Sequence, residues 1–352
     1  MRRGGWASLH FLRRARSVRP GAAASCMAAL VALCVAACSD PPATSATIGR
    51  QKTATTASLT GFQGVYEFAG KNSSSDANDP NLAGVDLVYY WSQIEPQEGV
   101  YEWNVIQSDM APWVATGKKV ILRVSTSGAA DWDPPYSGDA TPGWVYARGA
   151  RSVHDNGAKL PVYWDTAYLS AYQSFVTQFA AHFDGNPAVA FIQPGIGGGG
   201  ETLPEQNASP AAVSAWTAVG YKDARWKRTV ERIAKYFNAF RTTPVYPLVD
   251  RTFFDGSGRY FDGVMKWFRS VPNWGLQDDG LTQSQTLGPD WSGRPLALEQ
   301  LVATSDSGDS LSADINNAVT VLHASYLLIY RSDIIDPANA AALAQAKAAQ
   351  AT

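Results

Sequence analysis

The sequence predicts an α/β protein whose single domain is a closed (β/α)8 barrel, the TIM-barrel fold. Three observations lead to this prediction. Eight short apolar runs are spaced along the chain, segments with helical spacing alternate with them, and about 290 residues follow the N-terminal region. Apolar runs that alternate with amphipathic helices indicate parallel strands joined by right-handed crossovers. A domain of this length is the ordinary size for one such barrel.

The predicted strands are near-continuous apolar runs, as expected of parallel strands that are buried on both faces. They are residues 64–68, 84–91, 119–126, 188–195, 243–250, 273–279, 294–300 and 324–333. Three of the intervening segments have the spacing of amphipathic helices. They are residues 166–183, 225–240 and 312–325, and Asp165 is a candidate N-cap for the first.

The N-terminal region has a different composition. Residues 1–37 carry six arginines and no acid. The arginines all precede an apolar run at residues 26–38, and this order predicts a signal peptide. The run is too short to span a bilayer. Its end, "VAAC", resembles the bacterial lipobox, which implies cleavage before Cys38 and a lipid on Cys38. An ordinary signal peptide cut nearby is the alternative.

These features divide the chain and predict its location. Residues 1–37 are the predicted signal peptide of the lipoprotein type, and residues 38–60, which are small and polar, are a flexible tether. Residues 61–352 are the barrel. We expect an exported protein, held at the bacterial outer membrane or cell surface as a lipoprotein, or else a periplasmic or secreted one.

Charge and cysteine content exclude several classes of function. All three cysteines lie in the first 38 residues, so the mature domain has no disulfide and no thiol nucleophile. Removal of residues 1–37 takes away six of 29 basic residues and none of 31 acidic ones, which leaves a net charge of −8. An acidic domain argues against a nucleic-acid partner. We expect contact with the membrane through the lipid anchor only.

In a (β/α)8 barrel the chemistry lies where the strands end. The residues there are carboxylates, amides and aromatic rings, which suit the hydroxyl groups and C–H faces of sugars. Packing in the core is the alternative for any single tryptophan. The predicted substrate-binding residues are Trp91, Arg123, Trp132, Gln193, Asp250, Gln277 and Asp278.

A glycine-rich loop raises the possibility of a nucleotide site, because Gly195, Gly197 and Gly200 satisfy the pattern G-x-G-x-x-G. A dinucleotide site needs a helix directly after the glycines. Here Pro204 postpones any helix, and Glu201 would place a negative charge against the pyrophosphate. We therefore predict no cofactor. The glycines are instead expected to let a sugar approach Glu201, a solvated surface loop being the alternative.

No metal site is predicted. The acidic residues after the third strand, Asp131, Asp133 and Asp139, lack the spacing of a calcium loop. The histidines are scattered along the chain, which argues against zinc.

Two glutamates are the candidate catalytic residues. Cleavage of a glycosidic bond generally takes two carboxyl groups. Glu201 follows the fourth predicted strand, and Glu299 ends the otherwise apolar seventh, where a charge is costly unless it is paired or functional. The alternative for Glu299 is a salt bridge with Arg123. Glu205 is the rival of Glu201.

At this point the chain resembles a known group. Residues 89–124, with the motif "IEPQEGVYEW", look like the second and third βα units of clan A glycoside hydrolases, and family 42 beta-galactosidases are similar in this motif. The resemblance implies that Glu201 is the proton donor, that Glu299 is the nucleophile, and that Glu95 is structural. Gly200 stands where this clan usually has Asn. The loop "GIGGGGETLP" is instead similar to that of family 14 beta-amylases, which invert configuration.

The resulting hypothesis is a glycoside hydrolase that acts on O-glycosidic bonds of a poly- or oligosaccharide with a Glu/Glu pair, by retention or inversion. A carbohydrate substrate is the expected partner. Because Gly200 departs from the clan, a non-catalytic carbohydrate-binding lipoprotein on a degenerate barrel is the second hypothesis. A structural role at the outer membrane is the third.

Overall fold

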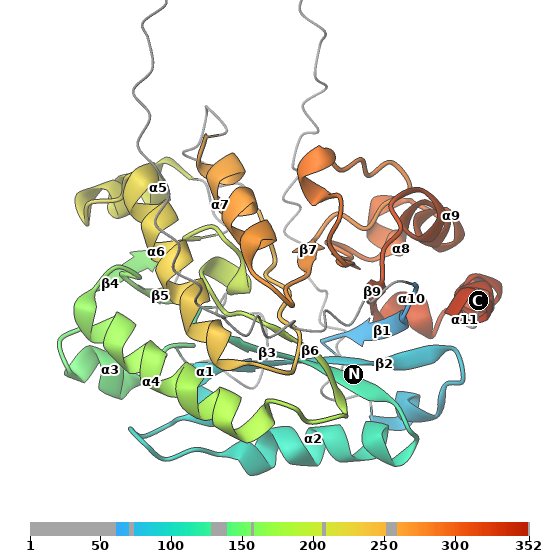
Figure 1. Cartoon of the computed structure of the whole chain (residues 1–352), viewed down its shortest axis with the longest axis horizontal. Coiled ribbons are helices and arrows are strands. Elements are labelled where there is room, and N and C mark those ends of the chain that lie inside the picture. The colour runs from blue at the N-terminus through green and yellow to red at the C-terminus, as the bar shows by residue number, and fades with distance from the viewer. Residues whose placement is uncertain are drawn as a thin grey trace, which may run out of the picture. The chain divides into compact units, whose positions relative to one another are not determined.

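The computed structural model describes residues 61–69, 74–127, 139–155, 158–205, 209–250 and 259–350, all within one compact unit, Ala54–Thr352 (Figure 1). The predicted parallel sheet is confirmed. Seven strands pair in parallel in the order β6-β3-β2-β1-β9-β8-β7. Their bounds are β1 Gly64–Phe68, β2 Leu82–Tyr90, β3 Lys119–Ser125, β6 Val189–Gln193, β7 Leu276–Asp278, β8 Leu296–Glu299 and β9 Tyr326–Tyr330.

An eighth extended segment, residues 244–249, closes this sheet between β6 and β7. Val245 forms parallel bridges to Ile192 and Trp274. The Tyr246 N–H donates to the Ile192 carbonyl at 2.9 Å. Pro244 and Pro247 have no N–H group, which interrupts the hydrogen-bond ladder and leaves bridges in place of a continuous strand. All eight predicted strands therefore occupy their predicted places, and the barrel is closed.

Helices follow the strands and cover the outside of the sheet (Figure 1). They are α1 Trp91–Ile94, α2 Trp103–Ala115, α3 Gly143–Ala147, α4 Thr166–Phe183, α5 Pro210–Ala218, α6 Asp223–Tyr236, α7 Arg259–Ser270, α8 Thr304–Ser307, α9 Leu311–Asn316, α10 Arg331–Ile334 and α11 Ala340–Gln350. Short 3-10 or π turns are η1 Ser74–Asn78, η2 Gly198–Gly200, η3 Phe237–Ala239, η4 Pro289–Trp291, η5 Asn317–Val321 and η6 Pro337–Asn339. An antiparallel hairpin, β4 Ser152–Asp155 and β5 Ala158–Pro161, follows α3.

The three predicted helices are present. The first coincides with α4, and the Asp165 carboxylate caps it by accepting a hydrogen bond from the Ala167 N–H at 2.9 Å. The second is α6 followed by η3, and the third is α9 followed by the π turn η5. Across the part of the chain that the structure describes, no helix is long and apolar enough to cross a bilayer.

The barrel interior consists of two layers of side chains. The aromatic layer, nearer the strand starts, comprises Tyr66, Phe191, Tyr246 and Tyr326, whose contacting rings have centroids 4.3–5.6 Å apart. Because alternate residues of a barrel strand face inward, Gln193, two positions after Phe191 on β6, faces the next layer. That second layer is polar and comprises Asp86, Arg123, Gln193, Gln277 and Glu299, all of them buried. The aromatic layer is thus the floor beneath the candidate site.

Candidate active site

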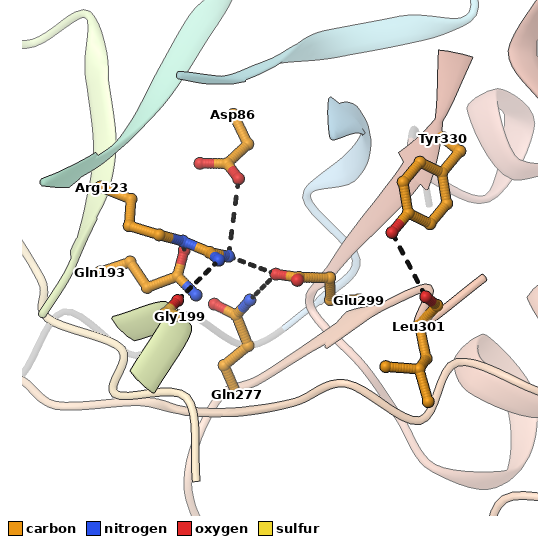
Figure 2. A network of polar contacts seen from close by, with 8 residues as sticks. All are labelled: Asp86, Arg123, Gln193, Gly199, Gln277, Glu299, Leu301 and Tyr330. Atoms are coloured by element: carbon orange, nitrogen blue, oxygen red, sulfur yellow. Dashed lines mark hydrogen bonds and ion pairs between the residues drawn. The ribbon is translucent and has the colours of Figure 1, made fainter. Parts of the chain in front are cut away.

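Arg123 lies at the centre of the polar layer (Figure 2). It comes from β3, its side chain is fully buried, and each nitrogen of its guanidinium has a partner. The Nε–H donates to Gln193 Oε1, Nη1 donates to the Gly199 carbonyl at 3.4 Å, and Nη2 pairs with Glu299 Oε2. Burial opposes the positive charge, but Glu299 and Asp86 outweigh it and raise the pKa of Arg123. The layer therefore has a permanent cation.

Glu299 ends β8 and is held by two donors. Its Oε2 accepts from Arg123 Nη2 and from Gln277 Nε2, the latter at 2.7 Å. Burial is the largest influence and leaves the pKa of Glu299 raised, although Arg123 and the neighbouring amides act in the opposite direction. The salt bridge foreseen as the alternative for Glu299 is therefore present. It is compatible with a nucleophile or base, because a cation beside a carboxyl group favours its ionised form.

Asp86 was not predicted as a site residue, yet it belongs to the same cluster. It lies in β2, is fully buried, and its Oδ2 is 3.7 Å from Arg123 Nη2. Burial raises the pKa of Asp86 to about 7, which Arg123 opposes and Glu299 reinforces. A signal was present in the sequence, since Asp86 is the one charged residue of the apolar run 84–91. The same signal had identified Glu299.

The glycine loop connects β6 to Glu201 by a tight backbone turn. A Cβ atom on Gly195 would lie 2.1 Å from the Val124 carbonyl oxygen, and one on Gly197 would lie 2.1 Å from that of Leu203. Gly200 has a φ of +92°, in the left-handed region. These glycines are thus required by the loop's own packing. Their predicted role in admitting a sugar stays a prediction.

The context of a dinucleotide site is missing after these glycines. Among the described residues the next α-helix, α5, begins only at Pro210, so none begins directly after the glycines, as a dinucleotide site needs. The loop instead places Glu201 in a buried position, with 4% of its surface exposed. The electrostatic field of Glu201 contributes to raising the pKa of Arg123, which places both predicted catalytic acids in the surroundings of one cation.

Glu201 lies beside two further acids, Asp250 and Asp279. One carboxylate oxygen from each of the three residues falls within 4.8 Å of the others. Asp250, a predicted site residue, is fixed through its backbone, which exchanges two hydrogen bonds with the Thr202 hydroxyl at 2.7 and 2.9 Å. Three such oxygens could hold a cation, although acidic clusters are common without one. The absence of a metal stays a prediction from the sequence.

Asp279, rather than Asp278, is the acid of its loop that meets Glu201. Asp278 Oδ1 accepts hydrogen bonds from the Gly280 N–H at 2.9 Å and from Gln285 Nε2 at 2.6 Å. Asp278 therefore shapes the loop after β7. Sequence reasoning could not separate two adjacent aspartates, because the contact that holds Asp278 comes from Gln285, seven residues further along the chain.

The structure does not bring Trp91 to the polar layer. Trp91 is fully buried, and its ring contacts Tyr172 and Phe175 with centroids 5.2 and 5.5 Å apart. Its Nε1–H donates to Glu95 Oε2 at 2.7 Å. Glu95 also accepts from the Gly99 N–H at 2.9 Å, so this carboxylate closes the "IEPQEG" turn. Packing, the alternative for each tryptophan, describes Trp91.

The remaining predicted residues are placed as follows. Trp132, Cys38 and the signal peptide lie outside the described residues, as do Asp131 and Asp133. Glu205, the rival of Glu201, is buried and accepts a hydrogen bond from Trp216 Nε1 at 2.5 Å. Arg123, Gln193, Gln277 and Glu299 are the predicted residues that contact one another directly.

Two cavities in the described region lie away from the polar layer. One of about 490 Å³ opens at the strand starts, beside Tyr66, Lys119 and Tyr326. The other, of about 330 Å³, lies between Glu95 and the first turns of α4. The loops at the strand ends include residues 128–138, 206–208 and 251–258, which are outside the described ranges.

Comparison with known proteins supports the resemblance seen in the sequence. Residues 74–195, which run from before β2 to just after β6, match the model of the glycoside hydrolase family 42, described as beta-galactosidase. A search of curated protein sequences found no match.

Among solved structures, the catalytic domain of beta-amylase from Paenibacillus polymyxa is similar in fold. It has a TM-score of 0.58 at 12% identity, over 79% of this chain and 94% of that one. The beta-galactosidase from Rahnella sp. R3 gives a TM-score of 0.48 at 11% identity, over 78% of this chain and 51% of that one. The beta-galactosidase from Marinomonas ef1 gives a TM-score of 0.40 at 14% identity, over 62% of this chain and 41% of that one. This chain thus spans about half the length of these two galactosidases.

The similarity in fold to the beta-amylase domain agrees with the closed barrel. In this chain Glu201 follows the fourth strand of the barrel, and Glu299 ends the seventh. The chain is therefore a (β/α)8 barrel, in which residues 74–195 match the model of the glycoside hydrolase family 42.

Proposed function

We propose that the protein is an exported glycoside hydrolase that cleaves O-glycosidic bonds of a poly- or oligosaccharide, with Glu201 and Glu299 as its carboxyl pair. The observation that carries this proposal is the contrast between the surroundings of the two acids. Glu299 contacts the cation Arg123, whereas Glu201 lies among other carboxyl groups. Two carboxyl groups in different electrostatic surroundings are suited to the roles of base and acid.

Glu299 is the nucleophile or base in this proposal. Arg123 Nη2 and Gln277 Nε2 both donate to its Oε2, and such donors stabilise the carboxylate over the neutral acid. The ionised oxygen would attack the anomeric carbon in a retaining enzyme, or would activate a water molecule in an inverting one.

Glu201 is the general acid. The carboxyl groups of Asp250 and Asp279 lie beside it, with one oxygen from each of the three residues within 4.8 Å of the others. A buried, protonated carboxyl can donate to the oxygen of the leaving sugar. The bond between the anomeric carbon and that oxygen breaks as the proton transfers.

The test is hydrolysis by the exported chain of a panel of beta-galactosides and other poly- and oligosaccharides. Glu201→Gln should lower kcat by roughly 10²- to 10⁴-fold, the contribution of general acid catalysis. Glu299→Gln should abolish turnover. Glu205→Gln is the matched control, because Gln can keep the bond to Trp216, and it should retain activity. Full activity of either of the first two variants would disprove the assignment.

The stereochemical course is decided by the same assay. Proton NMR of the first sugar released shows whether its anomeric configuration is that of the substrate. Retention would assign Glu299 as a nucleophile, and inversion would assign it as a base.

Gly200 favours a second candidate, a carbohydrate-binding protein without turnover. At this position the resembling glycosidases usually supply an Asn side chain, and a glycine with φ +92° offers no polar group beside Glu201. If this second function is correct, the native chain should bind a glycan but cleave no substrate. Glu201→Gln and Glu299→Gln should both retain that binding.

We also propose that Cys38 is the lipid attachment site, as its lipobox-like context indicates. The native chain should then fractionate with membranes and incorporate labelled fatty acid. Cys38→Ala should lose both properties, and label in that variant would contradict the proposal.

A further inference from the structure

We infer that Asp86 is a positioning residue of the site, which competes with Glu299 for one nitrogen of Arg123 and so controls how firmly the guanidinium holds Glu299. The inference rests on the proposed role of Glu299. Asp86 itself is not required to touch the substrate, since it acts through Arg123.

The shared nitrogen is Arg123 Nη2. Glu299 Oε2 is in direct contact with it, and Asp86 Oδ2 is 3.7 Å away (Figure 2). The other guanidinium nitrogens are engaged, because Nε donates to Gln193 and Nη1 donates to the Gly199 carbonyl. Two carboxyl groups from separate strands, β2 and β8, therefore share a single donor nitrogen.

No other donor or cation near Asp86, within the described residues, takes the place of Arg123. Asp86 is fully buried, and within the described ranges neither carboxyl oxygen accepts a hydrogen bond. The groups whose charge acts on it are Arg123 from β3 and Glu299 from β8. On β2 itself the charge of Asp86 contributes to the raised pKa of Tyr89, although burial and Asp109 are the larger causes.

The neighbouring strand β1 supplies no second cation. Phe68 places its ring 5.5 Å from the Arg123 guanidinium carbon. Glu67, between two inward-facing residues, belongs to the other face of the strand, where Arg331 Nε is 4.0 Å from it. Two buried acids thus face one nitrogen of the same cation, and such a cluster favours one negative charge over two.

The protonation state of Asp86 then decides the geometry at Glu299. Burial, reinforced by Glu299, raises the pKa of Asp86 to about 7 against the pull of Arg123. Below that pH Asp86 is neutral, and Arg123 pairs with Glu299 alone. Above it the ionised Asp86 attracts the same Nη2, and the contact between Arg123 and Glu299 loosens.

The first experiment is independent of activity. In the exported chain labelled with ¹³C at the aspartate carboxyls, NMR should show one carboxyl that titrates near pH 7 and that Asp86→Asn removes. Glu299→Gln should lower the pKa of that carboxyl by more than one unit, because Arg123 then serves Asp86 alone. Glu205→Gln, which alters a buried acid elsewhere, should leave it unchanged. An Asp86 pKa unaffected by Glu299→Gln overturns the inference.

The second experiment uses the reaction. Native kcat should fall as the pH rises above about 7, whereas Asp86→Asn should keep its kcat to higher pH with KM unchanged. A merely structural Asp86 would lower the melting temperature and reduce activity equally at every pH, and parallel profiles would overturn the inference. If no glycan is hydrolysed at all, the proposed function fails while the NMR titration still decides the role of Asp86.

Discussion

Two layers inside one barrel differ completely in chemistry. The aromatic layer is built from rings that contact one another, with no charged side chain among them. The polar layer shares only β6 with it, where Gln193 stands two residues after Phe191, and it contains one cation, two acids and two amides. A ring that loses a neighbour leaves a void, but an ion that loses its partner leaves a buried charge. The stability of the polar layer therefore depends on every one of its side chains, whereas the aromatic layer serves only as a packed base beneath it.

The largest effect is expected from Arg123→Met. This change leaves Asp86 and Glu299 buried without their cation, and removal of one partner from a buried pair costs about 3–5 kcal/mol. The free energy of unfolding, measured in urea at pH 7, should fall by that amount. At pH 4 the two acids are protonated more readily, so the loss should shrink. An equal loss at both pH values would contradict the account of the polar layer.

Phe191→Ala tests the aromatic layer in the same way. Phe191 is fully buried, with Tyr246 and Tyr326 at centroid distances of 4.3 and 5.0 Å. Truncation should lower the free energy of unfolding by about 3 kcal/mol through the cavity that it leaves. Unlike Arg123→Met, the loss should be the same at pH 4 and pH 7. Phe191→Leu, which keeps most of the volume, is the control with a smaller loss.

Asp86→Asn should change the pH dependence of stability. A carboxyl whose pKa is raised to about 7 in the folded state binds its proton there while the unfolded chain has already lost it. Stability conferred by this group is therefore complete below about pH 4 and is lost as the pH rises toward 7, by about 1.4 kcal/mol per pH unit. The variant should lack this decline. Unfolding measured across pH 4–7 would reject the prediction if the two slopes coincide.

The smallest effect is expected from Tyr246→Phe. The Tyr246 hydroxyl is buried, and no hydrogen-bond partner for it occurs among the residues that the structure describes. Its removal relieves an unsatisfied polar group and should change the free energy of unfolding by less than about 1 kcal/mol, in the stabilising direction. Gln277→Leu is the matched change in the polar layer and should destabilise, because Glu299 loses a donor. Similar results for the two variants would remove the contrast between the layers.

Much of the fold could be predicted because its signals are local. The eight strands are apolar runs bounded by polar residues, and α4 begins after an aspartate that caps it. Glu299 stood out for a related reason, since it is an acid at the end of an apolar run, and Glu201 stood out as the acid that follows the glycine-rich loop after such a run. Asp86 is also an acid in an apolar run, but it lies inside that run rather than at its end, and it was not among the predicted site residues. Trp91 was predicted to bind substrate but packs against Tyr172 in the core. No residue near Trp91 in the sequence distinguishes a ring at the strand ends from a ring in the core.

The sequence by itself determined the barrel, the order of its strands and the two glutamates at their ends, because each depends on residues close together along the chain. Only the tertiary structure decided which polar side chains share Arg123. Arg123 and Glu299 are 176 residues apart in sequence and meet because closure of the sheet turns their side chains inward at the same level. The competition of Asp86 for that cation follows from burial, which no stretch of sequence specifies alone.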